Sequence, residues 1–299
     1  MSVTVVPYSG WERNLRLAND QVELIVTLEV GPRIVRYGFI GEKNVFGEFA
    51  GQLGQKGESK WQIRGGHRFW IAPEQKPLTY ELDNGPVEFE EIEGGVRLIQ
   101  PQGPLSGIQK TMDIRLLDAN GRVSVRHSLT NRTDKAIACS PWALSVMAKK
   151  GLAIIPLPDV VPHDERLTPN QNWTLWSYTD LADQRYQIGS SLILIRQDPA
   201  RGPTKIGLAQ REGWIGYLAD GYLFVKHFQR LENASYPDCN VNCEIYTDED
   251  ILELETLGPL TSLEPGQSVQ HEEQWALFKD VPDCTCEEEV NADVLPYVM

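Results

Sequence analysis

The sequence lacks any hydrophobic run that approaches the roughly 20 residues a helix needs to cross a bilayer. Its first twenty residues contain neither a basic segment nor a long apolar segment, so they do not resemble a secretory signal. We therefore expect a cytoplasmic protein that does not interact with membranes.

Cysteine is also scarce, and the five cysteines are an odd number that does not suggest a disulfide framework. Cys284 and Cys286 are separated by one residue, which is too close for the usual zinc-binding spacing, and Cys239 and Cys243 are not followed by a second pair of ligands. We expect reduced thiols, no metal site and no cofactor.

Basic residues are too few for a nucleic-acid-binding protein. The chain has 28 lysines and arginines against 42 acidic residues, a formal net charge of −14, and no basic stripe. A phosphate backbone would be repelled by such a surface. The acidic residues are spread along the chain and are typical of a solvated surface.

Helical patterns are rare, whereas short strand patterns recur along the whole chain. Turn signals every 8–12 residues or so are typical of an all-β sandwich or barrel. Between two such runs, Asp118-Ala-Asn-Gly121 predicts a hairpin with a type I′ turn, because Asn-Gly readily adopts positive φ angles. The segment from Pro156 to Tyr186 is predicted to be a long ordered loop, and Cys284 to Val294 a short helix.

No low-complexity linker or internal repeat divides the chain. We therefore expect one domain over residues 1–299, with a core of roughly residues 20–280 and an acidic C-terminal tail over residues 281–299. The predicted fold is one large antiparallel β sandwich with few short helices.

The segment Arg64–Glu74 concentrates residues that can bind a ligand. Two glycines allow a sharp bend or a close approach to a ligand. If a strand follows the bend, His67 and Phe69 share one face while Arg68 and Trp70 share the other.

This mixture of groups suits a sugar site. Aromatic faces stack on a pyranose ring, and charged groups bind its hydroxyls. Arg64, Arg68, Trp70 and Glu74 are therefore candidate substrate-binding residues; the alternative is a structural bend whose arginine pairs with surface carboxylates.

A second candidate segment is the strand pattern from Leu252 to Leu257. Its alternation places Glu253 and Glu255 on one face, opposite Leu252 and Leu254. Such a face is ordinarily solvated. If it is instead concave and shared by two carboxylates, one pKa rises, which is a common way to produce a general acid or base.

Several motifs resemble the galactose-mutarotase-like (aldose epimerase) superfamily, and more closely an uncharacterised bacterial branch of it. The motifs span roughly residues 20–280 and read GGHRFWIAPE, SPWALSVMA, LTPNQNWTLWSYTDL, KIGLAQREGW, YPDCNVNCEIYT and LELETLGPLTSLEPGQSVQHEEQWALF. The resemblance implies a large antiparallel β supersandwich with a sugar cleft on its concave face.

The same resemblance implies roles for individual residues. A glutamate in a Leu-Glu-Thr strand is the general base of the epimerases, and here this pattern falls on Glu255. A His-Gly-Gly element that helps to bind the sugar corresponds loosely to Gly65-Gly66-His67, so His67 is a second candidate catalytic residue.

One departure from the family pattern affects the chemistry. The epimerases carry a general-acid histidine in a central Asn-His-x-Tyr-Phe strand, whereas the corresponding region here contains Trp142. An indole N–H is too weak an acid to replace that histidine. Either another group, such as His67, Lys205 or Glu74, supplies the acid, or the activity is absent; Trp142 itself is a candidate sugar-binding residue.

The remaining basic groups have two interpretations. Lys205, Lys226 and His227 could place cations in the cleft, where they would suit a uronic acid or a sugar phosphate. Alternatively, strand lysines only solvate an edge. His127 is expected to be structural and His271 to lie on the surface.

Three hypotheses follow, and all have a small-molecule carbohydrate as the ligand. The first is a mutarotase-like epimerase with Glu255 as base. The second is a carbohydrate-binding protein that lacks the general acid. The third is a uronate-directed lyase that uses Arg64, Arg68 or Tyr80. The sequence does not specify the sugar or the oligomeric state.

Overall fold

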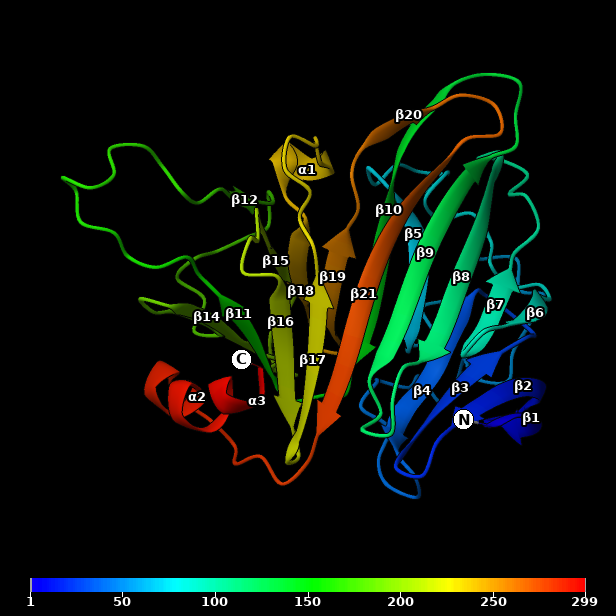
Figure 1. Cartoon of the computed structure of the whole chain (residues 1–299), viewed down its shortest axis with the longest axis horizontal. Coiled ribbons are helices and arrows are strands. Elements are labelled where there is room, and N and C mark those ends of the chain that lie inside the picture. Colours follow the sequence, from blue (N-terminus) through cyan, green and yellow to red (C-terminus); the bar gives the residue numbers. More distant parts are fainter. Residues whose placement is uncertain (1, 299) are drawn as a thin grey trace.

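The computed structural model describes residues 2–298. Two large antiparallel sheets pack face to face and form the molecule (Figure 1). Consecutive strands are mostly joined as hairpins, which is why the strand patterns recur at short spacing along the sequence. The fold prediction of an all-β sandwich is confirmed.

The first sheet carries the candidate site. In spatial order its strands are β1 (Ser2–Tyr8), β2 (Trp11–Ala18), β3 (Val22–Thr27), β4 (Arg33–Phe39), β5 (His67–Ala72), β10 (Ile137–Met147), β19 (Leu252–Leu257), β18 (Cys243–Thr247), β15 (Thr204–Leu208) and β12 (Trp173–Leu175), with β20 (Thr261–Leu263) paired to β10.

The second sheet covers the inner face of the first. In spatial order its strands are β13 (Tyr186–Ile188), β14 (Leu192–Arg196), β11 (Leu152–Pro156), β16 (Trp214–Ala219), β17 (Tyr222–Phe228), β21 (Ser268–Phe278), β9 (Val123–Asn131), β8 (Ile108–Leu116), β7 (Gly95–Ile99) and β6 (Glu88–Ile92).

The main hydrophobic core consists of side chains from both sheets, including Phe69 and Leu254 from the first and Phe224 and Trp275 from the second. Burial of this apolar surface is the main force that holds the sheets together. On the strands of the first sheet, alternate residues point away from this core, and these residues build the candidate site.

The helices are short and lie at the margins: α1 (Pro237–Asn240), α2 (Glu287–Asp293) and α3 (Leu295–Val298). The helix expected within Cys284 to Val294 is therefore confirmed as α2. Within residues 2–298, no helix is long and apolar enough to cross a membrane.

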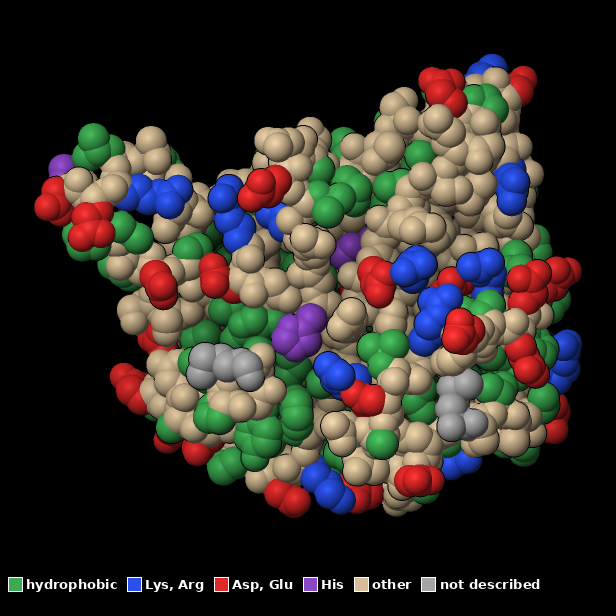
Figure 2. Space-filling view, viewed as in Figure 1, with side chains coloured by type: hydrophobic (Ala, Val, Ile, Leu, Met, Phe, Trp, Pro, Cys, Tyr) green, Lys and Arg blue, Asp and Glu red, His purple; other side chains and the backbone are tan. Residues whose placement is uncertain are grey.

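Basic and acidic side chains are interspersed over the face shown in Figure 2.

The hairpin between β8 and β9 is confirmed, but the predicted type I′ turn is wrong. Leu116 pairs with Val123, and the Gly121 N–H donates to the Asp118 carbonyl. Gly121 has a φ of +82°, whereas Asn120 is not among the positive-φ residues, and a type I′ turn needs both. The longer loop accommodates a turn with a single left-handed residue.

The segment from 157 to 185 contains only the short strand β12. Part of it projects as an arm from the body of the molecule (Figure 1). Its later part returns to the first sheet, where β12 pairs with β15 and brings Trp176 and Tyr178 close to the candidate site.

Candidate functional site

A pocket of about 300 Å³ lies on the outer face of the first sheet. It is centred on β5, β10, β19, β18 and β15, with further residues contributed by loops. The residues that line it are Trp61, Ile63, Arg68, Trp70, Glu74, Tyr80, Trp142, Leu144, Tyr178, Lys205, Tyr246, Asp248, Ile251, Glu253 and Glu255. Of the twelve candidate site residues from the sequence, eight line this pocket, whereas Arg64, His67, Lys226 and His227 do not.

The floor of the pocket is a small hydrophobic cluster separate from the main core. Trp70 and Trp142 are direct cross-strand partners on β5 and β10, with ring centroids 5.4 Å apart. Trp61 packs on Trp70 with centroids 4.8 Å apart, and Tyr80 lies 5.0 Å from the same ring. These rings give the pocket several aromatic surfaces of the kind that stack on the apolar face of a sugar.

Arg68 is held over these rings by a buried ion pair. Its guanidinium donates to Glu253 and lies 4.4 Å from the ring centroid of Trp70. Arg68 and Glu253 are both almost inaccessible to solvent. The position of each is fixed by the other, so neither charge is free to neutralise a charged ligand.

Glu255 lies at the bottom of the pocket, where its Oε2 atom has two donors. Trp142 Nε1 donates to it at 2.9 Å, and Lys205 Nζ donates at the same distance. Both of these bonds end on Oε2, and no donor within residues 2–298 forms a hydrogen bond to Oε1. Burial is the largest effect on the pKa of Glu255 and raises it, while the Lys205 ammonium opposes the shift.

Glu244 is a further acidic residue at this point, and sequence reasoning missed it. It pairs directly with Glu255 across β18 and β19, and its side chain is fully buried. Lys205 Nζ lies 2.6 Å from its Oε2. The signal was available in the sequence, because a hairpin around Asp248–Asp250 places Glu244 opposite Glu255.

Glu74 lies at the rim, where it accepts a hydrogen bond from the Tyr80 hydroxyl. Other lining residues were not singled out as site residues from the sequence: Trp61, Tyr178, Tyr246 and Asp248. The Tyr246 hydroxyl donates to Asp248 at 3.0 Å. Trp61 and Tyr178 come from loops, where no periodicity indicates the direction of a side chain.

Arg64 does not line the pocket, so its proposed role in substrate binding is not supported by its position. Its guanidinium donates to the carbonyls of Gln52 and Gln55 and pairs with Glu58. The two glycines after it also serve the backbone: a Cβ at Gly65 would meet the Gly47 carbonyl oxygen at 2.0 Å. The bend is therefore a structural device that positions β5.

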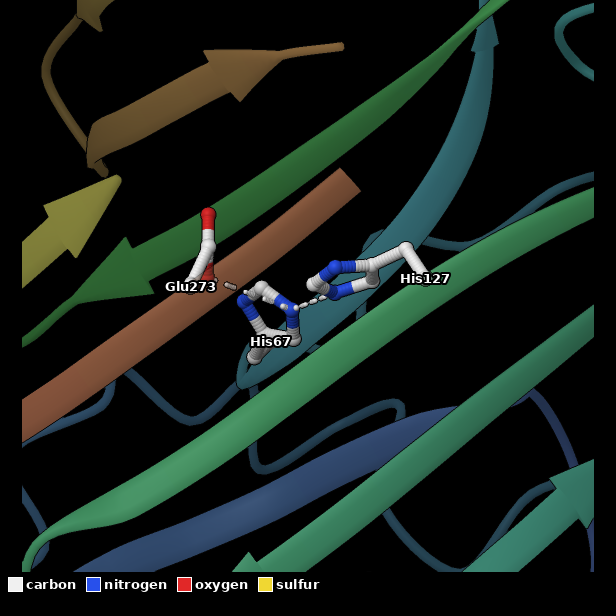
Figure 3. Close-up of side chains that lie close together, drawn as sticks. All are labelled: His67, His127 and Glu273. Atoms are coloured by element: carbon white, nitrogen blue, oxygen red, sulfur yellow. Dashed lines mark hydrogen bonds and ion pairs between the residues drawn. The ribbon is translucent and has the colours of Figure 1, made fainter. Parts of the chain in front are cut away.

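His67 and Lys226 face the interior between the sheets, not the pocket, which corrects both proposed roles. His67 alternates with Arg68 on β5 and so points to the opposite face. Figure 3 shows it beside His127 of β9 and Glu273 of β21. Lys226 lies on β17 of the second sheet, and its Nζ is 3.0 Å from Glu273. Both side chains are completely buried.

The interior polar groups form one connected hydrogen-bond network. His127 Nδ1 donates to the His271 carbonyl, so its Nε2 accepts from His67 Nε2 at 2.7 Å, and His67 Nδ1 accepts from Ser145 at 2.8 Å. Burial lowers the pKa of His127 to about 4, which keeps it neutral. His271 is buried and contacts Thr256 at 2.7 Å, so the expectation of a surface residue is wrong.

This cluster has the composition of a metal site, and its geometry tests that interpretation. Two nitrogens bound to one tetrahedral zinc ion lie about 3.3 Å apart, given bonds of about 2.0–2.1 Å. The two Nε2 atoms are 2.7 Å apart, which is a hydrogen-bond length. Glu273 already accepts from Thr256 and Trp275 and pairs with Lys226. The cluster therefore fits a hydrogen-bond network and not a metal centre.

No protein-family model matches the sequence, and no curated protein matches it. Solved structures do share its fold. A galactose mutarotase-like protein from Lactobacillus casei has a TM-score of 0.61 at 10% identity, with 89% of this chain and 100% of that chain covered. A galactose mutarotase related enzyme from Lactobacillus acidophilus has a TM-score of 0.57 at 8% identity, with 91% and 100% covered.

A TPR-domain containing protein from Parabacteroides distasonis also has this fold, with a TM-score of 0.60 at 14% identity. The match covers 90% of this chain but 47% of that one, so the chain spans about half the length of that protein. At these identities the similarity defines the fold alone: this chain has the galactose-mutarotase-like fold.

Proposed function

We propose that the chain binds a neutral monosaccharide in the pocket of the first sheet and interconverts its anomers, with Glu255 as the general base. The observation that carries the binding proposal is the aromatic floor of the pocket, formed by Trp61, Trp70, Tyr80 and Trp142 beside Glu255. A sugar ring would stack on these aromatic surfaces while one of its hydroxyls donates to Oε1 of Glu255.

The charge distribution favours a neutral sugar over a uronic acid or a sugar phosphate. Both cations that line the pocket are already neutralised, Arg68 by Glu253 and Lys205 by Glu255. Glu74 and Asp248 add further negative charge. An anionic substituent would therefore find no free cation, and this also argues against the lyase hypothesis.

The proposed chemistry requires only one mobile proton. Glu255 takes the proton of the anomeric hydroxyl on its free Oε1 atom, the O1–H electron pair forms the C1=O1 bond, and the C1–O5 pair moves to the ring oxygen. The proton then passes from Glu255 to that oxygen. O1 and O5 are bonded to the same carbon, so one carboxylate can reach both and a separate acid is not essential.

A second candidate function is sugar binding without turnover. It is favoured by the absence of any histidine from the residues that line the pocket, so the general acid of the epimerases has no equivalent there within residues 2–298. The cytoplasmic location and the carbohydrate partner remain part of the proposal.

Anomer exchange followed by NMR separates these functions. We expect the protein to accelerate exchange between the α and β forms of at least one neutral aldohexose, and Glu255→Gln to abolish the acceleration while binding is retained. Binding by the wild-type protein without any acceleration would support the second function. No binding of any neutral sugar would contradict both.

A further inference from the structure

Glu244 and Glu255 form a buried carboxyl pair served by one cation. They are opposite each other in the β18–β19 hairpin, and Glu244 is fully buried while Glu255 is 1% exposed. Lys205 Nζ reaches Oε2 of Glu244 at 2.6 Å and Oε2 of Glu255 at 2.9 Å. The same ammonium therefore serves both carboxyl groups.

The hydrogen bonds are divided unequally between the two. Glu255 receives well-directed donors from Trp142 and Lys205. Glu244 has only the ion pair of its Oε2 with Lys205, and its Oε1 is buried without a partner among residues 2–298. A buried carboxylate with an unpartnered oxygen is costly, whereas a protonated carboxyl group can donate to its neighbour.

Charge balance leads to the same conclusion. Two carboxylates and one ammonium in a buried site would leave one uncompensated negative charge, and adjacent carboxylates do not both ionise readily. One retained proton makes the group of three electrically neutral. The same proton also allows Glu244 to donate a hydrogen bond to Glu255.

We propose that Glu244 and Glu255 hold one proton between them at neutral pH, and that Glu244 is a positioning residue that sets how readily Glu255 accepts the proton of the sugar. The second half of this proposal rests on the proposed function. The first half concerns the protein without ligand and stands independently of it. Glu244 does not line the pocket and acts only through Glu255.

The surroundings of the pair support a retained proton. Burial is the largest cause that raises the pKa of each carboxyl group, and each lies in the field of another carboxylate. The other titratable or charged groups near the pair are Lys205 from β15, Glu253 from β19, Tyr246 and Cys243 from β18, Arg68 from β5, Asp238 from α1, Tyr178 from the loop after β12 and Lys226 from β17. Lys226 lies on the interior side of the sheet and is neutralised by Glu273. Arg68 is neutralised by Glu253 and so does not compensate the pair.

The test is a pH titration of the ligand-free protein labelled with ¹³C at the glutamate carboxyl carbons. We expect one glutamate carboxyl to remain protonated near neutral pH. Its titration midpoint should lie well above the ordinary glutamate value of about 4.3. This signal should disappear in Glu244→Gln and also in Glu255→Gln. The matched control is Glu272→Gln, which removes a half-exposed carboxyl of β21 and should leave the signal unchanged.

The pH profile of anomer exchange supplies the second readout. A protonated Glu244 donates to Glu255 and thereby lowers the pKa of Glu255. Loss of this donor in Glu244→Leu should raise that pKa, so the acid limb of the profile should move up by about one pH unit. Glu244→Asp, which restores a carboxyl group, should move the limb back toward that of the wild type.

The outcomes separate this proposal from the proposed function. A wild-type titration in which every glutamate is ionised near neutral pH would overturn the shared proton, whether or not sugars are turned over. A protonated pair in a protein that binds no neutral sugar would uphold the shared proton and end the proposed function. If Glu244→Gln does not fold, the wild-type and Glu255→Gln titrations decide the question.

Discussion

Trp142 donates its indole N–H to the same oxygen of Glu255 that accepts from Lys205, at 2.9 Å. Both donors act on Oε2, so they orient the carboxylate with Oε1 left for a ligand. The resemblance to the epimerases implies a general acid at the position of Trp142, but Trp142 contacts Glu255, which is the proposed base. Its role in this account is to stabilise and orient the Glu255 anion.

Replacement of Trp142 by phenylalanine should therefore slow the reaction more than it weakens binding. The aromatic surface is largely kept, but a hydrogen bond to a charged group is lost, which is worth about 1.5–3 kcal/mol. We expect kcat for anomer exchange to fall about tenfold or more at neutral pH, since 1.4 kcal/mol is a factor of ten. Kinetic measurements by NMR check this.

The matched control for that variant is Trp173→Phe. The Trp173 indole N–H donates to Gln171 outside the pocket, so its loss should leave the rate within about twofold of the wild type. A Trp142→Phe protein with the wild-type rate would show that the indole N–H does not support the base.

Arg68→Met should lower the free energy of unfolding of the protein and also its affinity for the sugar. It leaves Glu253 buried and unpaired, and breaking a buried pair costs about 3–5 kcal/mol. It also removes the positive charge over the ring of Trp70. We expect a lower free energy of unfolding in urea and an affinity at least about tenfold weaker by calorimetry.

The comparison for Arg68→Met is Arg126→Met, which breaks the half-exposed pair with Glu272. Such surface pairs contribute about 1 kcal/mol or less. Equal destabilisation by the two variants would contradict the view that the Arg68–Glu253 pair is buried and matters to the pocket.

Lys226→Met should destabilise the protein strongly, because Glu273 then keeps its charge in the interior without a cation. The expected loss is about 3–5 kcal/mol in urea unfolding. The double variant Lys226→Met, Glu273→Gln removes both charges and should recover part of that loss. A double variant less stable than Lys226→Met alone would contradict the ion pair as the source of the effect.

Acidification should destabilise the fold through the interior histidines. Burial lowers the pKa of His127 to about 4 and that of His271 to about 3, from an ordinary value of about 6.5. At pH values between the folded and the unfolded pKa of these histidines, the unfolded chain binds more protons than the folded one. The stabilisation by the neutral histidines is therefore fully present above about pH 6.5 and is lost as the pH falls through about 4 and then 3.

Urea unfolding at several pH values measures this dependence. Glu244 and Glu255 contribute a pH dependence of the opposite sign, because their pKa values are raised in the folded state. Above the ordinary glutamate pKa the folded state therefore holds more protons than the unfolded state, and their contribution to stability falls as the pH rises. In His127→Gln the loss of stability on acidification should be smaller. An unchanged pH dependence in that variant would show that His127 does not contribute.

Strand alternation was enough to predict part of the site. It placed Glu253 and Glu255 on one face of their strand and Arg68 and Trp70 on one face of theirs, and the structure brings these faces together on β19 and β5, which flank β10. The same rule separates His67 from Arg68. Its assignment to the cleft followed the family motif instead of the alternation, and the structure follows the alternation.

Other features depend on long-range pairing that local patterns do not specify. The sequence does not indicate that β17 belongs to the second sheet, so a lysine in a strand could not be assigned to the interior. The long loops that contribute Trp61 and Tyr178 have no periodicity. Glu244 could have been found, because only a hairpin register was needed to pair it with Glu255.

The central claim is that this pocket binds a neutral sugar, and calorimetric titration tests it most directly. The wild-type protein, Trp70→Ala and the Trp173→Phe control would each be titrated with neutral aldohexoses and with the corresponding uronic acids. We predict saturable binding of a neutral sugar by the wild-type and control proteins. Binding should be at least about tenfold weaker for Trp70→Ala and for the uronic acids. Tighter binding of a uronic acid, or equal binding by Trp70→Ala, would contradict the account.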